Sequence, residues 1–158
     1  MTDLSKRQSD YAVYLPAISS FYTKQLEKVL REVDSRVPAG FEKGYNGLDF
    51  LDPNGYFHYN KGLYSAGHAQ LDLIKTDKDE PMIQKRDRNT SMILGDSGGF
   101  QIATGVMKMD WANAKDPNDP ARTAICEKIL RWLEHTADWS MTLDIPAFAA
   151  VEPLSSKT

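Results

Sequence analysis

The 158-residue sequence lacks features that would place it in several large protein classes. Its single cysteine excludes an internal disulfide, and it excludes a zinc site built from several cysteines within these residues. No apolar run approaches the ~20 residues that a membrane-spanning helix needs, and residues 1–10 lack the apolar core of a secretory signal. The 19 Lys and Arg against 22 Asp and Glu leave a net charge of -3, which provides no overall basic coat. We therefore expect a cytoplasmic chain without a membrane partner.

The composition is sufficient for one folded domain. Hydrophobic residues make up 41% and aromatic residues 10%, enough for an ordinary buried core. We expect a flexible arm over residues 1–10, one domain over residues 11–150 and a linker-like tail over residues 151–158. The sequence shows no internal repeat.

The first half of the domain mixes one helical pattern with short segments. Residues 11–15 (YAVYL) predict a buried strand, and apolar spacings of three and four predict a helix over residues 17–36. Glycine and proline between residues 40 and 60 indicate turns between extended pieces, around residues 48–51 and 56–59.

The middle of the chain gives weaker patterns. Residues 62–68 (GLYSAGH) form a small-residue segment that leads into a possible helix over residues 69–74. The highly charged stretch over residues 75–90 indicates a solvated loop.

The second half predicts a βαβ unit. Residues 91–95 (SMILG) indicate a buried strand, and Asp119 is the expected cap of a helix from Pro120 to about His135. The apolar positions of this helix are expected to face the core; they are Ala121, Ile125, Ile129, Trp132 and Leu133. Residues 139–143 (WSMTL) indicate a second buried strand. A strand, helix, strand order implies a parallel sheet, so the fold class is α/β. Asp96 and Asp144 then fall at the carboxyl ends of strands, where such folds place their chemistry.

The run from Asp96 to Gln101, with the sequence DSGGFQ, is the most informative segment. Adjacent glycines after a strand allow positive φ angles or close approach of a ligand to the backbone. The carboxylate supplies hydrogen-bond acceptors and the Gln101 amide supplies both donor and acceptor, which suits a planar polar ring. The alternative is a Gly-Gly turn in which Asp96 caps the following helix. Asp144 likewise is either a second carboxylate facing that ring or a turn residue before Pro146.

These two elements, ILGDSGGFQ at residues 93–101 and MTLDIP at residues 141–146, resemble the tRNA-guanine transglycosylase superfamily. The resemblance covers roughly residues 92–150. It implies a (β/α)8 TIM barrel, of which this chain would be the N-terminal half, and exchange of guanine in nucleic acid for a 7-deazaguanine base. The first ninety residues do not show the usual opening of the tRNA enzymes, so the resemblance is closer to the DNA-modifying branch found in phages and bacterial islands, whose early region is divergent. That branch would place the chain in the host cytoplasm if a phage encodes it.

The resemblance also implies the site residues. Asp96 is assigned to the catalytic site, where it and Asp144 would hold the base. The other implied substrate-binding residues are Ser97, Gly98, Gly99, Phe100, Gln101 and, in the segment 64–68 around the pocket, His68. The family's nucleophilic Asp and zinc site lie later in the barrel than Thr158. We therefore expect no metal or other cofactor within this chain, and no activity of the chain alone.

Several functions follow as hypotheses. The first is the base-pocket part of a guanine transglycosylase acting on DNA; the close alternative is the same chemistry on tRNA. In either case the chain would be a split-gene subunit completed by a second chain, a truncated reading frame or a remnant without activity. A non-catalytic base-binding module is the second class. The third is a small α/β domain whose Gly-Gly turn only caps a helix.

Other residues receive simpler interpretations. Cys126 is expected to be a small buried hydrophobe, and His135 to complement the helix dipole. Metal-ligand spacing is absent among the three histidines, which are His58, His68 and His135. The aromatic residues Phe50, Tyr56, Phe57 and Tyr59 are expected to pack in the core. Lys85, Arg86 and Arg88 are the candidate contacts to backbone phosphates.

Overall fold

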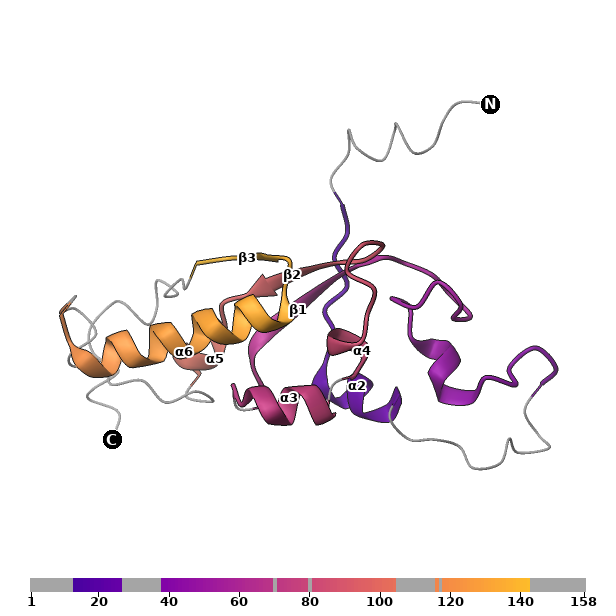
Figure 1. The fold of residues 1–158 in the computed structure, drawn as a ribbon, viewed down its shortest axis with the longest axis horizontal. Helices are drawn as coiled ribbons and strands as arrows, with labels where there is room; N and C mark the ends of the chain where they lie inside the picture. The colour runs from indigo at the N-terminus through magenta and orange to yellow at the C-terminus, as the bar shows by residue number, and fades with distance from the viewer. Residues whose placement is uncertain are drawn as a thin grey trace, which may run out of the picture.

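The computed structural model describes residues 13–26, 38–69, 71–79, 81–104, 116 and 118–142. Its centre is a three-stranded parallel sheet in the order β1 (Lys61–Ala69), β2 (Met92–Asp96), β3 (Trp139–Ser140). The labelled helices lie below the strands in the view of Figure 1. The α/β class and the parallel sheet predicted from the sequence are confirmed.

Strand β2 forms the middle of the sheet, as its apolar run predicts. Its residues alternate between buried and half-buried, so that Ile93 and Gly95 face the helical layer. Gly95 lies directly against the long helix, because a Cβ there would come within 2.6 Å of Leu133 and 2.8 Å of Ala137. Any larger residue at position 95 would therefore push this helix away from the sheet.

Helix α6 (Pro120–Thr136) confirms the predicted cap and core face. The Asp119 carboxylate accepts a hydrogen bond from the Arg122 N–H at 2.8 Å, and Pro120 opens the first turn. Ile129, Trp132 and Leu133 are buried, and the Trp132 ring stacks on that of Tyr64 in β1 with centroids 5.0 Å apart. Of the other positions predicted for the core face, Ile125 is half-buried and Ala121 is exposed.

The prediction for residues 62–74 is wrong. This segment is strand β1, and the helix that follows, α3 (Leu73–Asp79), starts only at Leu73. The small residues belong to a tightly packed strand: a Cβ at Gly62 would approach the Ile18 side chain to 2.8 Å. A close neighbour, rather than a turn, explains the glycine here.

The charged stretch over residues 75–90 is helical in its first part, so the predicted loop is wrong there. Residues 85–90 form bends and turns that are exposed except at Arg86, as the loop prediction has it. Helix α3 continues to Asp79, and α4 (Pro81–Gln84) follows it. Met82 and Ile83 in α4 are fully buried. Two buried side chains anchor this segment to the core, although its charged neighbours dominate the composition.

The predicted strand over residues 11–15 is also wrong where it is described. Tyr14 is 76% exposed, and the chain joins the sheet later, through a parallel bridge between Ala17 and Leu63. Helix α2 (Ser20–Leu26) then confirms the start of the predicted helix, with Leu26 buried and Tyr22 half-buried. The rest of that prediction, residues 27–36, lies outside the described residues.

Residues 40–60 form turns and a short 3₁₀ helix, η1 (Gly44–Leu48), instead of extended pieces. Local hydrogen bonds hold this shape: the Leu51 N–H donates to the Asp49 carboxylate at 2.9 Å, and the Tyr56 N–H donates to the Gly47 carbonyl at 2.6 Å. Side chains that bond to nearby backbone groups compete with strand pairing.

Strand β3 exists where the sequence predicts it, but it is exposed. Trp139 is 70% exposed, and Ser140 is exposed as well. The sequence instead predicts a buried strand that continues to Leu143, and Leu143 lies outside the described residues. Among the described residues no strand lies beyond β3, so the outer backbone groups of β3 have no strand partner there.

Candidate functional site

Asp96 ends the middle strand of the sheet, at the edge that the sequence indicates. Its direct neighbour in register on β1 is Ser65. The Ser65 hydroxyl donates a hydrogen bond to Asp96 Oδ2 at 2.8 Å. The other carboxylate oxygen, Oδ1, lies 3.4 Å from the Gly98 N–H. Asp96 as a whole residue is half-buried, and both of its carboxylate oxygens accept a hydrogen bond from the protein.

One of the two adjacent glycines, Gly98, adopts a positive φ angle. Gly98 has φ 77° and ψ 21°, in the left-handed region that favours glycine. It is the N-cap of the short helix α5 (Gly99–Ala103) and, as glycine, has no side chain to cap the helix. The alternative in which Asp96 holds the start of this helix is met in part, because Asp96 Oδ1 accepts a long hydrogen bond from the Gly98 N–H at 3.4 Å.

The remaining residues of the run present different faces. Ser97 is fully buried, whereas the Phe100 ring is 62% exposed at the start of α5. Gln101 is half-buried, and its side-chain Oε1 is buried without a hydrogen-bond partner among the described residues. The run thus combines a held carboxylate, a buried amide oxygen and an accessible aromatic ring.

Two predicted site residues, Asp144 and the side chain of His68, lie outside the described part of the chain. His68 belongs to β1 by its backbone, beyond Ser65, but its side chain is outside what the structure describes. On the third strand, the Met141 N–H donates to the Gly95 carbonyl at 2.9 Å. The chain leading towards position 144 therefore starts next to the end of β2.

Ser65 lies in the candidate site, but the sequence analysis does not single it out. Only the segment 64–68 as a whole was expected near the pocket. A strand assignment for residues 61–69 would have found Ser65, because parallel strands of one sheet present their carboxyl ends at the same edge. The small residues of this segment obscured that strand.

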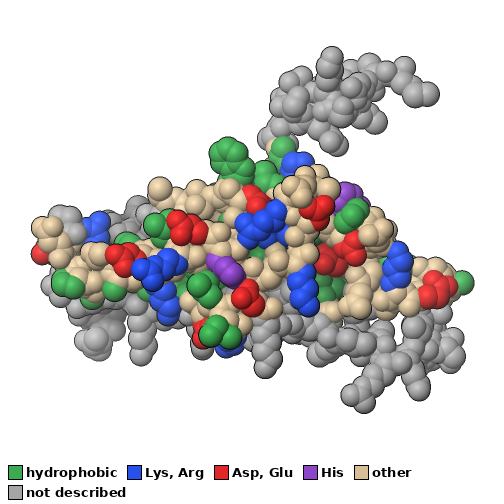
Figure 2. All heavy atoms as spheres, viewed as in Figure 1, with side chains coloured by type: hydrophobic (Ala, Val, Ile, Leu, Met, Phe, Trp, Pro, Cys, Tyr) green, Lys and Arg blue, Asp and Glu red, His purple; other side chains and the backbone are tan. Residues whose placement is uncertain are grey.

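The predicted phosphate contacts are not a free basic patch. The Arg86 side chain is fully buried and forms an ion pair with Asp138 at 2.8 Å. Arg88 lies 3.5 Å from the same carboxylate and donates to the carbonyls of His135 and Ala137. Lys85 remains exposed. Figure 2 shows cationic and anionic side chains interspersed on the face in view.

The structure agrees only in part with the expectations for His135, Cys126 and the aromatic residues. The His135 ring, in the last turn of α6, lies 2.6 Å from the Asp77 carboxylate of α3, a contact that the helix-dipole interpretation did not include. Cys126 is half-buried rather than buried. Among the aromatic residues, Phe50 packs against the core near Tyr22, but Phe57 is 65% exposed.

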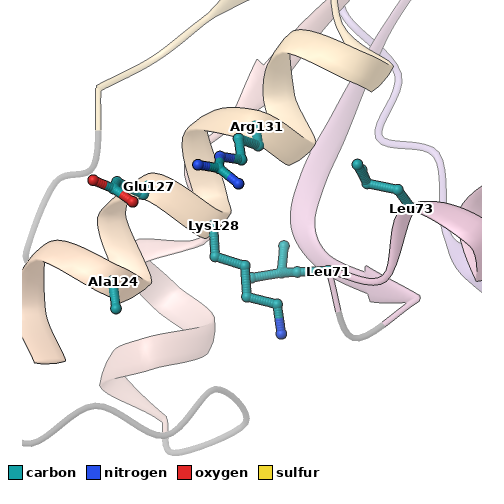
Figure 3. A pocket seen from close by; sticks show the side chains of 6 residues that line it. All are labelled: Leu71, Leu73, Ala124, Glu127, Lys128 and Arg131. Carbon is teal, nitrogen blue, oxygen red and sulfur yellow. The ribbon is translucent and has the colours of Figure 1, made fainter.

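Two surface hollows lie along α6, away from Asp96. One, of about 210 Å³, is shown in Figure 3 between α6 and the segment leading into α3. Its lining residues are Leu71, Leu73, Ala124, Glu127, Lys128 and Arg131. A second, of about 340 Å³, is lined by Arg122, Thr123, Cys126, Glu127 and Leu130. Neither lining includes a residue of the DSGGFQ run.

Two kinds of site are not found in the part of the chain that the structure describes. It contains no group of three or more His, Cys, Asp or Glu side chains that could hold a metal ion. None of its helices has the length and apolar character needed to cross a membrane.

Comparison of the chain with protein-family models, with curated proteins and with solved structures found no match.

Proposed function

We propose that the chain is the base-binding part of a guanine transglycosylase that exchanges guanine in DNA for a 7-deazaguanine base. One observation carries this proposal. A carboxylate at the carboxyl end of the middle parallel strand is held at 2.8 Å by a hydroxyl from the neighbouring strand, directly before a left-handed glycine. Ligands of open and closed parallel sheets bind at this end of the strands.

The donor and acceptor pattern of the site suits guanine. The base presents an N1–H and a 2-amino group side by side, and an ionised carboxylate accepts hydrogen bonds only. Asp96 would accept from this edge. The Gln101 Oε1 is buried without a partner among the described residues, so the Gln101 amide would have to turn outward to accept an N–H of the base.

Phe100 supports a flipped base as the ligand. A base inside a duplex cannot present its sugar carbon to an enzyme, so the target must leave the stack. The Phe100 ring is 62% exposed and lies four positions after Asp96. Stacking on such a ring replaces part of the base stacking that flipping removes.

The exchange needs groups beyond those assigned in this chain. In the proposed double displacement, a carboxylate oxygen attacks the sugar C1′, the glycosidic bond breaks, and guanine leaves with the bonding electrons and takes up a proton. The incoming deazaguanine then attacks C1′, loses its proton and releases the carboxylate. Asp96 and Asp144 would hold each base in turn, and a second chain that completes the barrel would supply the nucleophile.

The zinc implied by the family resemblance has no place among the described residues, which offer no cluster of ligands. No step of the proposed exchange passes through it here. The role proposed for this chain is base recognition.

The test is exchange of radiolabelled guanine into DNA and into tRNA. The chain is assayed alone and together with the product of any adjacent reading frame. We expect exchange into DNA only with the second chain. Asp96→Asn should lower the rate by about tenfold to a hundredfold, because a charged acceptor in the base contact is replaced by a mixed amide.

Asp87→Asn is the matched control, since Asp87 is an exposed carboxylate that holds a local turn. It should exchange guanine as the unmodified chain does. Exchange into tRNA alone would move the proposal to the tRNA enzymes. Base binding without exchange would leave a binding module, and neither binding nor exchange by folded protein would overturn the proposal.

A further inference from the structure

Ser65 has an arrangement that its sequence position does not suggest. It lies 31 positions before Asp96 and yet is its register partner across the β1–β2 ladder. Its side chain is nearly buried, with 9% of the residue exposed. A buried hydroxyl requires a partner, and the Asp96 carboxylate is the closest acceptor, at 2.8 Å.

The hydrogen bond from Ser65 restricts the orientation of the Asp96 carboxylate but does not use all of its acceptor positions. Each carboxylate oxygen has two acceptor positions, so Oδ2 can accept from Ser65 and from one ligand donor. Oδ1 accepts from the Gly98 N–H at 3.4 Å, a long hydrogen bond, and has one further acceptor position for a second donor. Rotation of the carboxylate plane would break the Ser65 bond. The two oxygens are therefore presented in one orientation.

We propose that Ser65 is a positioning residue that fixes the Asp96 carboxylate for two-point recognition, and so selects bases carrying two adjacent N–H donors. This inference rests on the proposed function. Guanine and its 7-deaza analogues have the N1–H and the 2-amino group, whereas hypoxanthine has the N1–H alone. A carboxylate held in one orientation increases the affinity for a base with a second N–H donor, because bidentate contacts need both oxygens in the plane of the base.

One competing role exists for the hydroxyl. Ser65 Oγ also lies 3.2 Å from the Ala66 carbonyl, a bond that would serve the strand alone. Serine has one proton to donate, so it cannot donate fully to both acceptors. The shorter distance favours Asp96. The two roles differ in what removal of the hydroxyl does to base discrimination.

The experiment measures equilibrium binding of radiolabelled guanine and hypoxanthine to the full chain, with the second chain present if one is found. Ser65→Thr and Ser65→Val form a matched pair, because the two side chains have nearly the same shape and differ in the hydroxyl. Both suit a strand. Any cost of the added methyl group is shared, and thermal unfolding of each variant is recorded beside the affinities.

We expect the unmodified chain and Ser65→Thr to bind guanine about tenfold more tightly than hypoxanthine, as one charge-assisted hydrogen bond allows. Ser65→Val should lose most of this preference, with guanine affinity falling and hypoxanthine affinity nearly unchanged. Equal loss for both bases would instead indicate the structural role and overturn the inference.

The result also separates the two proposals. If Asp96→Asn abolishes guanine binding but Ser65→Val keeps the same preference as Ser65→Thr, the proposed function stands and the role of Ser65 is wrong. If the folded, unmodified chain binds neither base, both are wrong.

Discussion

At the scale of single residues, the Arg86–Asp138 pair shows how much a charge depends on its surroundings. The Arg86 guanidinium is buried, and burial lowers its pKa while Asp138 partly offsets that effect. Asp138 Oδ2 also accepts from the Ile93 N–H at 2.7 Å, within β2. One carboxylate therefore connects the segment after α4 to the central strand and to the start of β3.

Asp138→Ala should destabilise the protein by about 3 kcal/mol, because it leaves a buried guanidinium without its counter-charge. Chemical denaturation followed by circular dichroism measures this. Arg86→Met combined with Asp138→Ala should recover part of the loss, since the uncompensated charge is gone. If the double variant is as unstable as the sum of both single variants, the ion pair is not the cause.

The same pair removes Arg86 from the three candidate phosphate contacts, whereas Lys85 and Arg88 are exposed. A run with Lys85, Arg86 and Arg88 is typical of a phosphate-binding surface when only charge is visible. The acidic partner of Arg86 comes 52 positions later, and charge alone does not indicate which guanidinium will be buried.

At the scale of elements, α6 is the one whose bounds the sequence predicts best. Its start depends on Asp119 and Pro120, its core face on apolar spacing, and all of these are local signals. Its end is marked by the Ala137 N–H donating to the Leu133 carbonyl.

Asp119→Ala should cost about 1 kcal/mol of stability, because it removes the acceptor for the Arg122 N–H at the helix start. Thermal or urea unfolding measures the change. Asp119→Ser retains a capping oxygen and should stay within a few tenths of a kcal/mol of the unmodified protein. A stability loss of the same size in both variants would contradict the capping role.

Strand β1 is the element that local signals miss. Its glycine and alanine residues lower its strand propensity, and the polar residues that flank it at both ends are typical of loops. Its identity depends on contacts from elsewhere: Ile18 fills the space over Gly62, Trp132 stacks on Tyr64, and β2 pairs with residues 61–65. Tertiary packing outweighs intrinsic propensity here.

At the scale of the whole molecule, the sheet is protected unequally. Strand β2 pairs on both sides and lies against α6, whereas β3 pairs with β2 alone among the described residues and exposes Trp139. Hydrogen exchange followed by mass spectrometry should therefore find the slowest amides in β2 and fast exchange in β3. Equal protection of both strands would contradict an open edge. Protection of β3 that rises with protein concentration would indicate that a second copy covers it.

The candidate site divides in the same way between local and long-range information. The DSGGFQ run is visible in the sequence, and Asp96 does end a strand, as the pattern predicts. The run also contains its own left-handed glycine. The hydroxyl that orients Asp96 is not visible, because Ser65 becomes its neighbour only when β1 and β2 pair.

The sequence by itself determined the α/β class, the middle strand and the capped helix α6, because these depend on residues close together in the chain. Apolar alternation, a helix cap and a glycine pair each act within a few positions. The tertiary structure alone decided which charges are buried, which small residues form a strand and which hydroxyl meets Asp96. Those outcomes depend on contacts between residues 31 to 68 positions apart, where packing and desolvation outweigh local preference.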